Sequence, residues 1–403
     1  MKKLLTILGS VGLVATTSAA VIACGDKTSQ KTPDTKPTEE TKKETKKEDK
    51  NNEENQKNES KPINPENDKK NSEVIKAIVK KQEDAFATFH TRKDFLDQIK
   101  VFAKEEGIEN LELANKNENK TFKEGENIPE NNVKLRLGTH EFDVELGDVL
   151  KDRVATKYYI ENDKGNIITD QDGQFSNLNN KVVITQIGYS LKPRDEYSNN
   201  GEKVIEIHKM PGNTKEVPKH LPLKIKSLNN AFQKFKLKEV LNLDKWDVSN
   251  VELMDEMFYG ATNFDQDISN WNTENVKSMS GLFAGAENFN QSLNSWNVSK
   301  VTQMSYMFHE AKKFNQHLDK WNVSSVIDME SMFLSAESFN GKIDNWNVQN
   351  VNKLGEMFLS AVKFSQNLSK WKIKENVFEN SRNIFDKTYG YEREVSEAWR
   401  RNK

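Results

Sequence analysis

Hydrophobic residues recur at one fixed interval in the second half of the chain. Six tryptophans stand 25 residues apart, at Trp246, Trp271, Trp296, Trp321, Trp346 and Trp371. Each opens a copy that reads roughly W-N-V-S-x-V-x-x-M-x-x-M-F-x-x-A-x-x-F-N-Q-x-L. A period of this length is typical of repeat architectures, in which each copy buries its apolar face against its neighbours. The pattern therefore predicts a stack of copies.

Each copy has two halves with different periods. The first half of the copy from Trp296 places apolar residues at helical spacing, at Val301, Met304, Met307, Phe308 and Ala311. Ser299 stands where a side chain would cap the first turn of such a helix. Gly285 stands where the helix of the preceding copy would end. The second half, from Phe314 to Val323, reads as extended chain. We expect a short helix and a short strand in every copy.

A single copy does not bury enough apolar surface to fold alone. Burying one large apolar side chain contributes roughly 1.5–3 kcal/mol, whereas ordering one residue costs about 1.5 kcal/mol. Neighbouring copies must supply the remaining contacts. This predicts an α+β, leucine-rich-repeat-like solenoid with capped ends over residues 227–385. Leu228, Ala231 and Phe232 fit a degenerate first copy, and beyond Trp371 the pattern decays toward a charged tail at 386–403.

Residues 72–115 are predicted to form a helical hairpin. One apolar stripe comprises Val74, Ile75, Ile78, Val79, Phe86 and Phe89, and a second comprises Phe95, Leu96, Ile99, Phe102 and Ala103. Thr91 followed by Asp94 resembles a capping arrangement at the start of the second helix. The aromatic residues of these stripes fit a hydrophobic core better than a ligand site.

Residues 116–226 are predicted to form a small β-rich module. Val133–Leu137 alternates apolar and polar residues, as does Phe142–Leu146, and Gly138 between them indicates a hairpin. Two further pairs of strands flank turn signals at Asp163-Lys164-Gly165 and Asn200-Gly201: Tyr158–Ile160 with Ile167–Ile168, and Val182–Tyr189 with Val204–Ile207.

The chain begins with a segment that resembles a targeting signal. Lys2 and Lys3 precede the uncharged run Leu4–Ala23, which ends directly before Cys24. This arrangement resembles the lipobox of bacterial lipoproteins. The resemblance implies that residues 1–23 are removed and that Cys24 is diacylated, which would anchor the chain on the extracellular face of the cell membrane. The alternatives are an uncleaved membrane helix or an ordinary cleaved signal.

Residues 24–71 carry the predicted lipidated cysteine followed by a linker. From Asp26 to Asn71 the only aliphatic residue is Ile63, and the rest is dominated by charged and polar residues. A segment of this composition cannot form a core and is expected to be disordered. A flexible chain of this length spans about 40 Å on average. We expect it to hold the folded part away from the membrane.

Composition and motifs exclude several classes of function. The net charge of −2 gives no reason to expect nucleic-acid binding, and a single cysteine allows neither an intrachain disulfide nor a cysteine metal cage. Asp265 and Asp267 could suggest calcium, but the next copy has Asn290 and Ser292 there, so no metal is predicted. No phosphate loop, H-E-x-x-H or G-x-S-x-G occurs. We therefore expect no cofactor and no enzyme; residues 115–226 are where catalysis stays an open alternative.

We call the residues at one position of successive copies a column, and several columns carry side chains that could have a specific role. One column comprises Gln266, Gln291, Gln316 and Gln366, for which we predict a partly buried amide ladder bonded to the backbone of adjacent copies. The tryptophans are expected to pack in the core rather than form a ligand row. His309 and His317 are interpreted as surface residues. One variable column comprises Tyr259, Ala284, His309, Leu334 and Leu359, and its variation fits either a binding scaffold or an unconstrained surface.

The motifs W-N-V-S-x-V, M-x-x-M-F and A-x-x-F-N-Q resemble the 25-residue repeats of BspA-like leucine-rich-repeat surface proteins, which are abundant lipoproteins of mycoplasmas. The lead-in Ile184–Tyr189 is also similar, and the resemblance covers about residues 181–385. It implies a solenoid, surface exposure, and a role in adhesion or host interaction. This chain departs from the pattern at Thr273-Glu274, at Gly341 and at Leu354.

Together these features predict a lipid-anchored surface protein that displays a repeat scaffold for protein–protein contacts. The expected partners are the membrane, through diacylated Cys24, and a host surface or matrix protein. The main alternative is a structural or antigenic coat lipoprotein without a dedicated ligand, and an enzyme is the third hypothesis.

Overall fold

The computed structural model describes residues 65–81, 91–116, 120–123, 128, 131–146, 153–173, 175, 179–194 and 202–385. These residues belong to a compact unit that begins at Pro62. The predicted signal segment, Cys24, most of the predicted linker and the C-terminal tail lie outside the described residues. Among the helices that are described, none combines the length and the apolar character needed to cross a membrane.

The first described body combines two helices with a small sheet. Helix α1 (Pro65–Lys81) and helix α3 (Arg92–Glu105) pack with strands β1 (Leu111–Leu113), β2 (Val133–Leu137) and β3 (His140–Val144), which pair in that order. The two helices and the sheet share one hydrophobic core: Ile75, Val79, Phe95, Leu96, Ile99, Ala103, Leu111, Val133, Leu135 and Val144 are among its buried members.

Local sequence signals explain most of this body. The hydroxyl of Thr91 accepts a hydrogen bond from the Asp94 amide at 3.1 Å, so the predicted cap of α3 is confirmed. Strands β2 and β3 form the predicted antiparallel hairpin, in which Gly138 adopts a φ of 55° at the turn. The first helix begins earlier than predicted, at Pro65, a residue type favoured at the first helical position.

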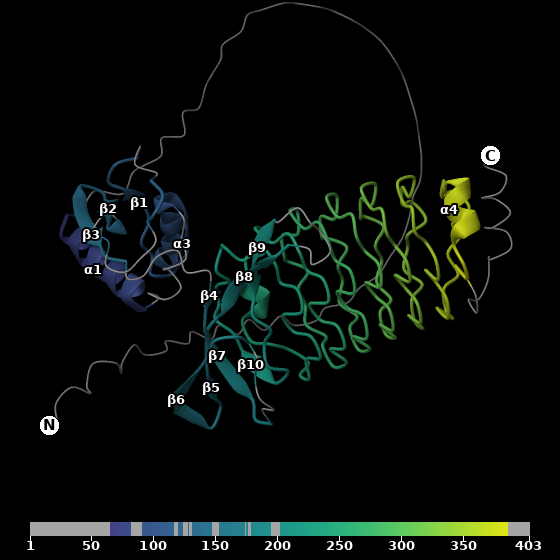
Figure 1. Cartoon of the computed structure of the whole chain (residues 1–403), viewed down its shortest axis with the longest axis horizontal. Coiled ribbons are helices and arrows are strands. Elements are labelled where there is room, and N and C mark those ends of the chain that lie inside the picture. The colour runs from purple at the N-terminus through teal and green to yellow at the C-terminus, as the bar shows by residue number, and fades with distance from the viewer. Residues whose placement is uncertain are drawn as a thin grey trace, which may run out of the picture. The chain divides into compact units, whose positions relative to one another are not determined.

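The second body begins with two further sheets, which lead into the repeats (Figure 1). One sheet has the order β10-β7-β5-β6 and the other the order β4-β8-β9. Their strands are β4 (Arg153–Val154), β5 (Thr156–Ile160), β6 (Asp163–Asp170), β7 (Val182–Gln186), β8 (Tyr189–Pro193), β9 (Lys203–Ile207) and β10 (Thr214–Glu216). The predicted pairing of β5 with β6 is confirmed, but the predicted turn is wrong: the chain turns at Glu161 and Asn162, and Asp163-Lys164-Gly165 belongs to β6.

A glycine divides what the sequence presented as one strand, Val182–Tyr189. Strand β7 ends at Gln186, and after Gly188 the chain continues as β8 in the other sheet. A Cβ atom at Gly188 would lie 2.3 Å from the Thr156 hydroxyl oxygen and 2.5 Å from Nδ1 of His208. These contacts leave no room for a side chain, so glycine permits the close crossing of the two sheets.

The histidine at this crossing predicts a pH dependence of stability. His208 is 5% exposed, and burial, aided by the charge of Arg153, lowers its pKa from 6.5 to about 4; Asp170 and Asp172 oppose the shift and Lys192 adds to it. The unfolded state therefore binds a proton between these pH values that the folded state does not. Above pH 6.5 the protonation of His208 therefore does not reduce the free energy of unfolding. As the pH falls toward 4, the free energy of unfolding decreases by about 2–3 kcal/mol at most.

We expect this loss in urea unfolding of the protein at pH 7 and pH 4.5, followed by circular dichroism. His208→Gln should reduce the difference between the two pH values, because glutamine does not titrate. The control His317→Gln alters an exposed histidine and should reduce the difference less than His208→Gln does. Equal pH dependence in all three proteins would refute the role of His208.

From Ser227 onward the copies lie side by side (Figure 1). Single parallel bridges join one residue of each copy to its counterpart in the next, along Ser227, Leu253, Ser278, Gln303, Asp328 and Lys353. The degenerate first copy is confirmed, because Phe232 is fully buried and its ring stacks on Phe258 at 5.7 Å. A short 3-10 helix, η2 (Leu243–Lys245), precedes Trp246, and helix α4 (Glu375–Asn380) follows Trp371.

The prediction of a helix-plus-strand, leucine-rich-repeat-like solenoid is wrong. Between Trp246 and Trp371 the described chain contains turns and single bridges but no helix and no strand. The regular structure lies mainly in the small antiparallel sheets and helices before the copies. The apolar residues that suggested a helix, from Val301 to Ala311, instead form consecutive turns.

The backbone of these turns alternates between two kinds of hydrogen bond. In the copy from Trp296, the amides of Met304, Tyr306, Phe308 and Glu310 donate to carbonyls of the next copy, at 2.8–2.9 Å. The intervening amides of Met307, His309 and Ala311 donate within the copy to the carbonyl three residues before, at 3.0–3.3 Å. A helix would use every amide locally, whereas here half of them hold neighbouring copies together.

Two residues per copy turn the chain away from a helix. Tyr306 and Glu310 have φ values of 57° and 54°, and the other copies from Trp246 to Trp346 have left-handed residues at the same two positions. The predicted cap at Ser299 is also wrong, because the Ser299 amide donates to Asn297 Oδ1 instead. The left-handed residues interrupt the helical path every few residues, which replaces a continuous helix with separate turns.

The core of the second body is continuous from β4 to the end of the described chain. Phe258, Phe283, Phe308, Phe333, Phe358 and Phe385 stack with ring centroids 5.5–5.7 Å apart. The tryptophans of the copies are 1–4% exposed, and the indole of Trp321 donates to the Leu293 carbonyl at 2.8 Å. The prediction that the tryptophans pack in the core is confirmed.

Candidate binding surface

Fixed polar columns tie the copies to one another. Nε2 of Gln316 donates to the Asn290 carbonyl at 2.9 Å, and Gln291 and Gln366 make the equivalent bond. Gln266 accepts from the Val240 amide and donates to the Val240 carbonyl. All four are half-buried. The predicted amide ladder is therefore confirmed.

A second ladder runs beside the glutamines, which the sequence reading did not identify. The side-chain oxygen of Asn290 accepts from the Asn315 amide at 2.9 Å, and that of Asn315 accepts from the Asn340 amide at 2.8 Å. Asp265 opens this column and Ser365 closes it. The column was visible in the sequence as the polar residue after the second phenylalanine of each copy, which is asparagine in the three inner copies.

Other columns vary in chemistry from copy to copy. We define the variable columns as four sets of five residues on the turn half of the copies: Glu252, Lys277, Thr302, Ile327 and Asn352; Glu256, Gly281, Tyr306, Ser331 and Glu356; Tyr259, Ala284, His309, Leu334 and Leu359; Thr262, Glu287, Lys312, Glu337 and Val362. The backbone bonds between copies run through the same segment. Except at Gly281, Ala284 and Ser331, which are buried, chemical variety is thus displayed on a fixed frame.

The variable columns also present exposed apolar side chains. Tyr259, Tyr306, Ile327 and Val362 are 41–45% exposed. Each stands in a column where other copies place charged or small residues. Aromatic side chains on a surface are the residues most often found at the centre of protein interfaces. Tyr259 and Tyr306 are therefore the candidate anchors of this surface.

Tyr306 differs from Tyr259 because its backbone is strained. A bulky residue at a φ of 57° is an outlier, and the left-handed conformation costs roughly 1–2 kcal/mol for a residue with a side chain. The corresponding residues Glu256, Gly281, Ser331 and Glu356 also have a positive φ, so this conformation belongs to the frame of the copies. Tyr306 is distinguished by the large exposed ring that it places there.

The surroundings of Tyr306 add polar groups to this anchor. Its ring lies 5.8 Å from that of His309, measured between centroids. Nε2 of His309 lies 3.3 Å from the carboxylate of Glu310, while its Nδ1 is buried without a hydrogen-bond partner. Lys353 and Asp328 form an ion pair at 2.9 Å in the column beside it. The exposed ring matches the aromatic enrichment of interface centres, and its charged neighbours match the polar rim around such a centre.

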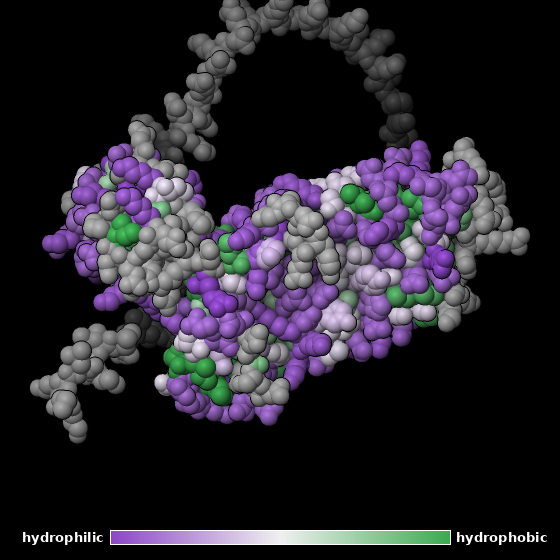
Figure 2. Space-filling view, viewed as in Figure 1, coloured by the Kyte–Doolittle hydropathy of each residue, from purple (hydrophilic) through white to green (hydrophobic). Residues whose placement is uncertain are grey.

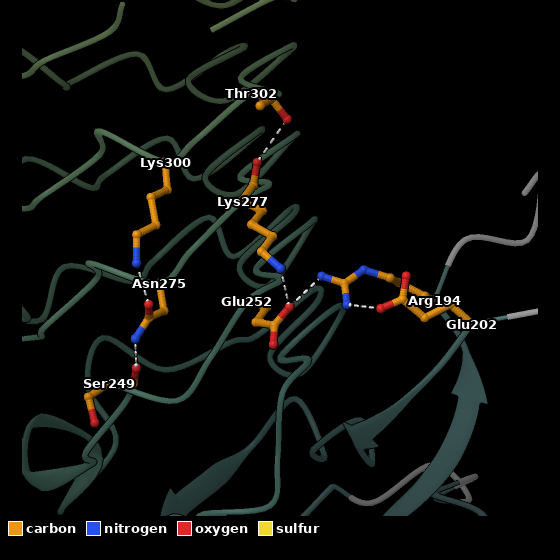
Figure 3. A network of polar contacts seen from close by, with 8 residues as sticks. All are labelled: Arg194, Glu202, Ser249, Glu252, Asn275, Lys277, Lys300 and Thr302. Atoms are coloured by element: carbon orange, nitrogen blue, oxygen red, sulfur yellow. Dashed lines mark hydrogen bonds and ion pairs between the residues drawn. The ribbon is translucent and has the colours of Figure 1, made fainter. Parts of the chain in front are cut away.

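A network of charges closes the N-terminal end of the same face (Figure 3). Arg194, which follows β8, donates to Glu202 at 2.8 Å and also bonds Glu252 in the first tryptophan copy. Lys277 from the second copy donates to the same Glu252 oxygen at 2.7 Å. Burial alone would raise the pKa of Glu252, but the bonds from Lys277 and Arg194 outweigh it and lower that pKa. The network joins the β9 hairpin to two copies.

A shallow groove of about 740 Å³ lies where β10 meets the first copies. Its lining includes Lys215, Asp244, Gln266 and Asp267. Each of these groups already has an internal partner: Lys215 pairs with Glu161, Asp244 with Lys245, Gln266 with Val240, and Asp267 with the Ser269 amide. The groove therefore offers few free groups to a small ligand.

The remaining residues that the sequence singled out have structural contacts. Asp265 accepts from the Asn290 amide at 3.1 Å, and Asp267 accepts from the Ser269 amide at 2.9 Å. Nδ1 of the exposed His317 accepts a hydrogen bond from the backbone amide of Lys342 at 3.2 Å. Across the described ranges, histidine, cysteine, aspartate and glutamate nowhere gather in a group of three that could hold a metal ion.

Comparison with protein families gives a match over the repeats. Residues 226–336 and 317–402 match a family model described as "Mycoplasma protein of unknown function, DUF285". The two matched stretches cover the copies and extend beyond Trp371. No curated protein and no solved structure matches the chain. The family match supports a repeat protein of mycoplasma type.

Proposed function

We propose that this chain is a lipid-anchored surface protein whose variable columns bind a partner protein on a host cell or in its matrix. It would resemble BspA-like surface lipoproteins in this display function. Cys24 carries the lipid, and the copies present side chains to the outside. The observation that carries the proposal is Tyr306, an exposed aromatic residue that stands where the other copies have glutamate, glycine or serine.

The frame and the surface of the copies support this division of roles. The buried phenylalanine and tryptophan columns and the glutamine ladder repeat from copy to copy, so they maintain the frame. The variable columns change from acidic to basic to aromatic over the same distance. Binding energy in protein interfaces concentrates in a few aromatic and charged residues surrounded by weaker contacts. Tyr306, with His309 beside it, fits the role of such a residue.

The proposal is tested by binding of residues 24–403, carrying Cys24→Ser, to host cells and to a panel of matrix proteins. Saturable binding is expected for the unaltered surface. Tyr306→Ala and Tyr306→Gly should each weaken it about tenfold or more, because truncation of an anchor costs more than 1 kcal/mol. Leu241→Ala is the control, because it truncates an exposed hydrophobic side chain outside the variable columns and should leave binding unchanged.

The same variants separate strain from packing. Tyr306→Gly should be more stable than Tyr306→Ala by about 1 kcal/mol, because glycine adopts a positive φ without steric cost. In a regular segment the order would be reversed. Urea unfolding of both variants measures this difference. Binding that survives both substitutions would remove Tyr306 from the site, and a complete lack of binding to cells and matrix proteins would favour a coat protein without a dedicated ligand.

The anchor has a separate test. Cys24→Ser in the cell should move the protein from the membrane fraction to the soluble fraction, because no thiol remains to carry acyl chains. Metabolic labelling with a palmitate analogue should mark the unaltered protein and not the variant. Retention of the variant in the membrane would indicate that Leu4–Ala23 stays as a spanning helix instead.

A further inference from the structure

Strand β6 presents an open sheet edge. In the order β10-β7-β5-β6 it pairs with β5 on one side, and within the described residues no strand pairs with its other side. Strand β6 runs for eight residues, and six of them are exposed. Ile167 is 49% exposed, and Figure 2 shows hydrophobic surface over the β5–β6 hairpin. An open edge of this length offers unpaired backbone groups to another strand.

The sequence of β6 is complementary to itself in one antiparallel register. If Ile167 of one molecule lies opposite Ile167 of another, Lys164 lies opposite Asp170 and Asp170 opposite Lys164. The pairing then contains an apolar pair at its centre and two pairs of opposite charge at its ends. Both kinds of cross-strand pair are stabilising.

The neighbouring registers lack this complementarity. A shift that places Asn166 opposite Ile167 brings Asp163 opposite Asp170, and like charges in that position are unfavourable. Centring the pair on Asn166 places Lys164 opposite Ile168 and leaves both charges without a partner across the strands. Centring the pair on Ile168 places Lys164 opposite Asp172, which lies beyond the end of β6 and pairs with Arg153. Among the pairings confined to β6, its charges therefore favour the register centred on Ile167, and the resulting interface is two-fold symmetric.

We propose that two copies of this chain associate through the outer edges of their β6 strands, with Ile167 on the symmetry axis. The joined sheets continue from one molecule into the other. Residues with even numbers, including Ile168 and Asp170, keep the same face of the sheet in both molecules. This contact lies apart from the variable columns of the copies, so it does not depend on the proposed ligand site.

A cysteine at the axis tests the register directly. The protein is residues 24–403 with Cys24→Ser, so an introduced cysteine is its one thiol. Ile167→Cys places two thiols on directly opposed positions, within reach of a disulfide. Under mild oxidation it should form a covalent dimer. Thr169→Cys is the matched control: it lies opposite Gly165 of the other copy, and the two cysteines are about 13 Å apart along the strands.

Sedimentation equilibrium provides a second readout without oxidation. The protein is expected to show a concentration-dependent dimer. Ile167→Lys places two ammonium groups opposite each other and should raise the dissociation constant about tenfold or more. A monomer at every concentration, equal cross-linking of Ile167→Cys and Thr169→Cys, or a dimer unaffected by Ile167→Lys would each overturn the proposal.

Discussion

Phe308→Ala is expected to reduce the free energy of unfolding by about 3–5 kcal/mol, the range for deletion of a fully buried phenylalanine. Phe308 is 0% exposed. Its ring stacks between Phe283 and Phe333, at 5.7 and 5.5 Å, and lies 4.0 Å from Phe314. Because the ring contributes to the interface with both neighbouring copies, its loss weakens two interfaces at once. Urea unfolding monitored by tryptophan fluorescence measures the change.

The control for Phe308→Ala is Val362→Ala, which removes apolar atoms from a half-exposed side chain of another copy. It should change the stability by less than about 0.5 kcal/mol. Hydrogen exchange adds a local readout, since the amides of Tyr306 and Glu310 donate to the next copy and should lose protection in Phe308→Ala. A loss below about 1 kcal/mol, with protection retained, would show that the stack tolerates a gap at this ring.

Gly341→Gln is expected to destabilise the protein by about 2–3 kcal/mol, although it restores the residue that most other copies have at this position. A Cβ atom at Gly341 would lie 2.0 Å from the carbonyl oxygen of Gln316 and 3.0 Å from the Phe339 ring. Gly341 is buried. Next to it the Leu318 amide donates directly to the Lys342 carbonyl at 3.2 Å. Glycine has let the two backbones approach, so a side chain has no space there.

The comparison variant is Gln316→Gly. It removes a glutamine side chain at the equivalent position of the preceding copy, where the backbone leaves space for one. Gln316→Gly should lose the bonds to Asn290 and cost about 1–2 kcal/mol. If Gly341→Gln instead raised the midpoint of urea unfolding, the backbone at Gly341 would have relaxed to the path of the other copies. The close approach to Gln316 would then be a consequence of the missing side chain rather than a constraint.

The sequence predicted which side chains of the copies are buried, but it did not predict the backbone conformation of the copies. The spacing of Val301, Met304 and Phe308 correctly identified buried residues, because an apolar stripe marks the core whatever the backbone does. It did not identify the conformation, because turns of three residues reproduce much of the helical spacing. The decisive residues, such as Tyr306 and Glu310 with positive φ, are not glycines. Their conformation is imposed by bonds to the next copy, which local sequence does not encode.

The same limit applies to the candidate surface. The glutamine ladder was predictable, because Gln316 lies between the apolar residues Phe314 and Leu318, whether the segment is a strand or an irregular chain. Tyr306 was not identified from the sequence, because no other copy has an aromatic residue at this position and the repeat pattern therefore does not mark it. The available signal was its column, in which Gly281 occupies the same position. The crossing at Gly188 was missed for a related reason, because the groups that exclude a side chain there, Thr156 and His208, are remote in sequence.

The asparagine ladder has a consequence for how the gene can change. The bond from Asn315 to Asn290 is repeated between Asn340 and Asn315, so an inner copy fits any neighbour of the same frame. Recombination that removes or duplicates one copy of 25 residues leaves every such bond with a partner, whereas loss of a single residue shifts all columns beyond it. The length of the protein can therefore vary in whole copies, and each variant presents a new order of surface residues on an unchanged frame.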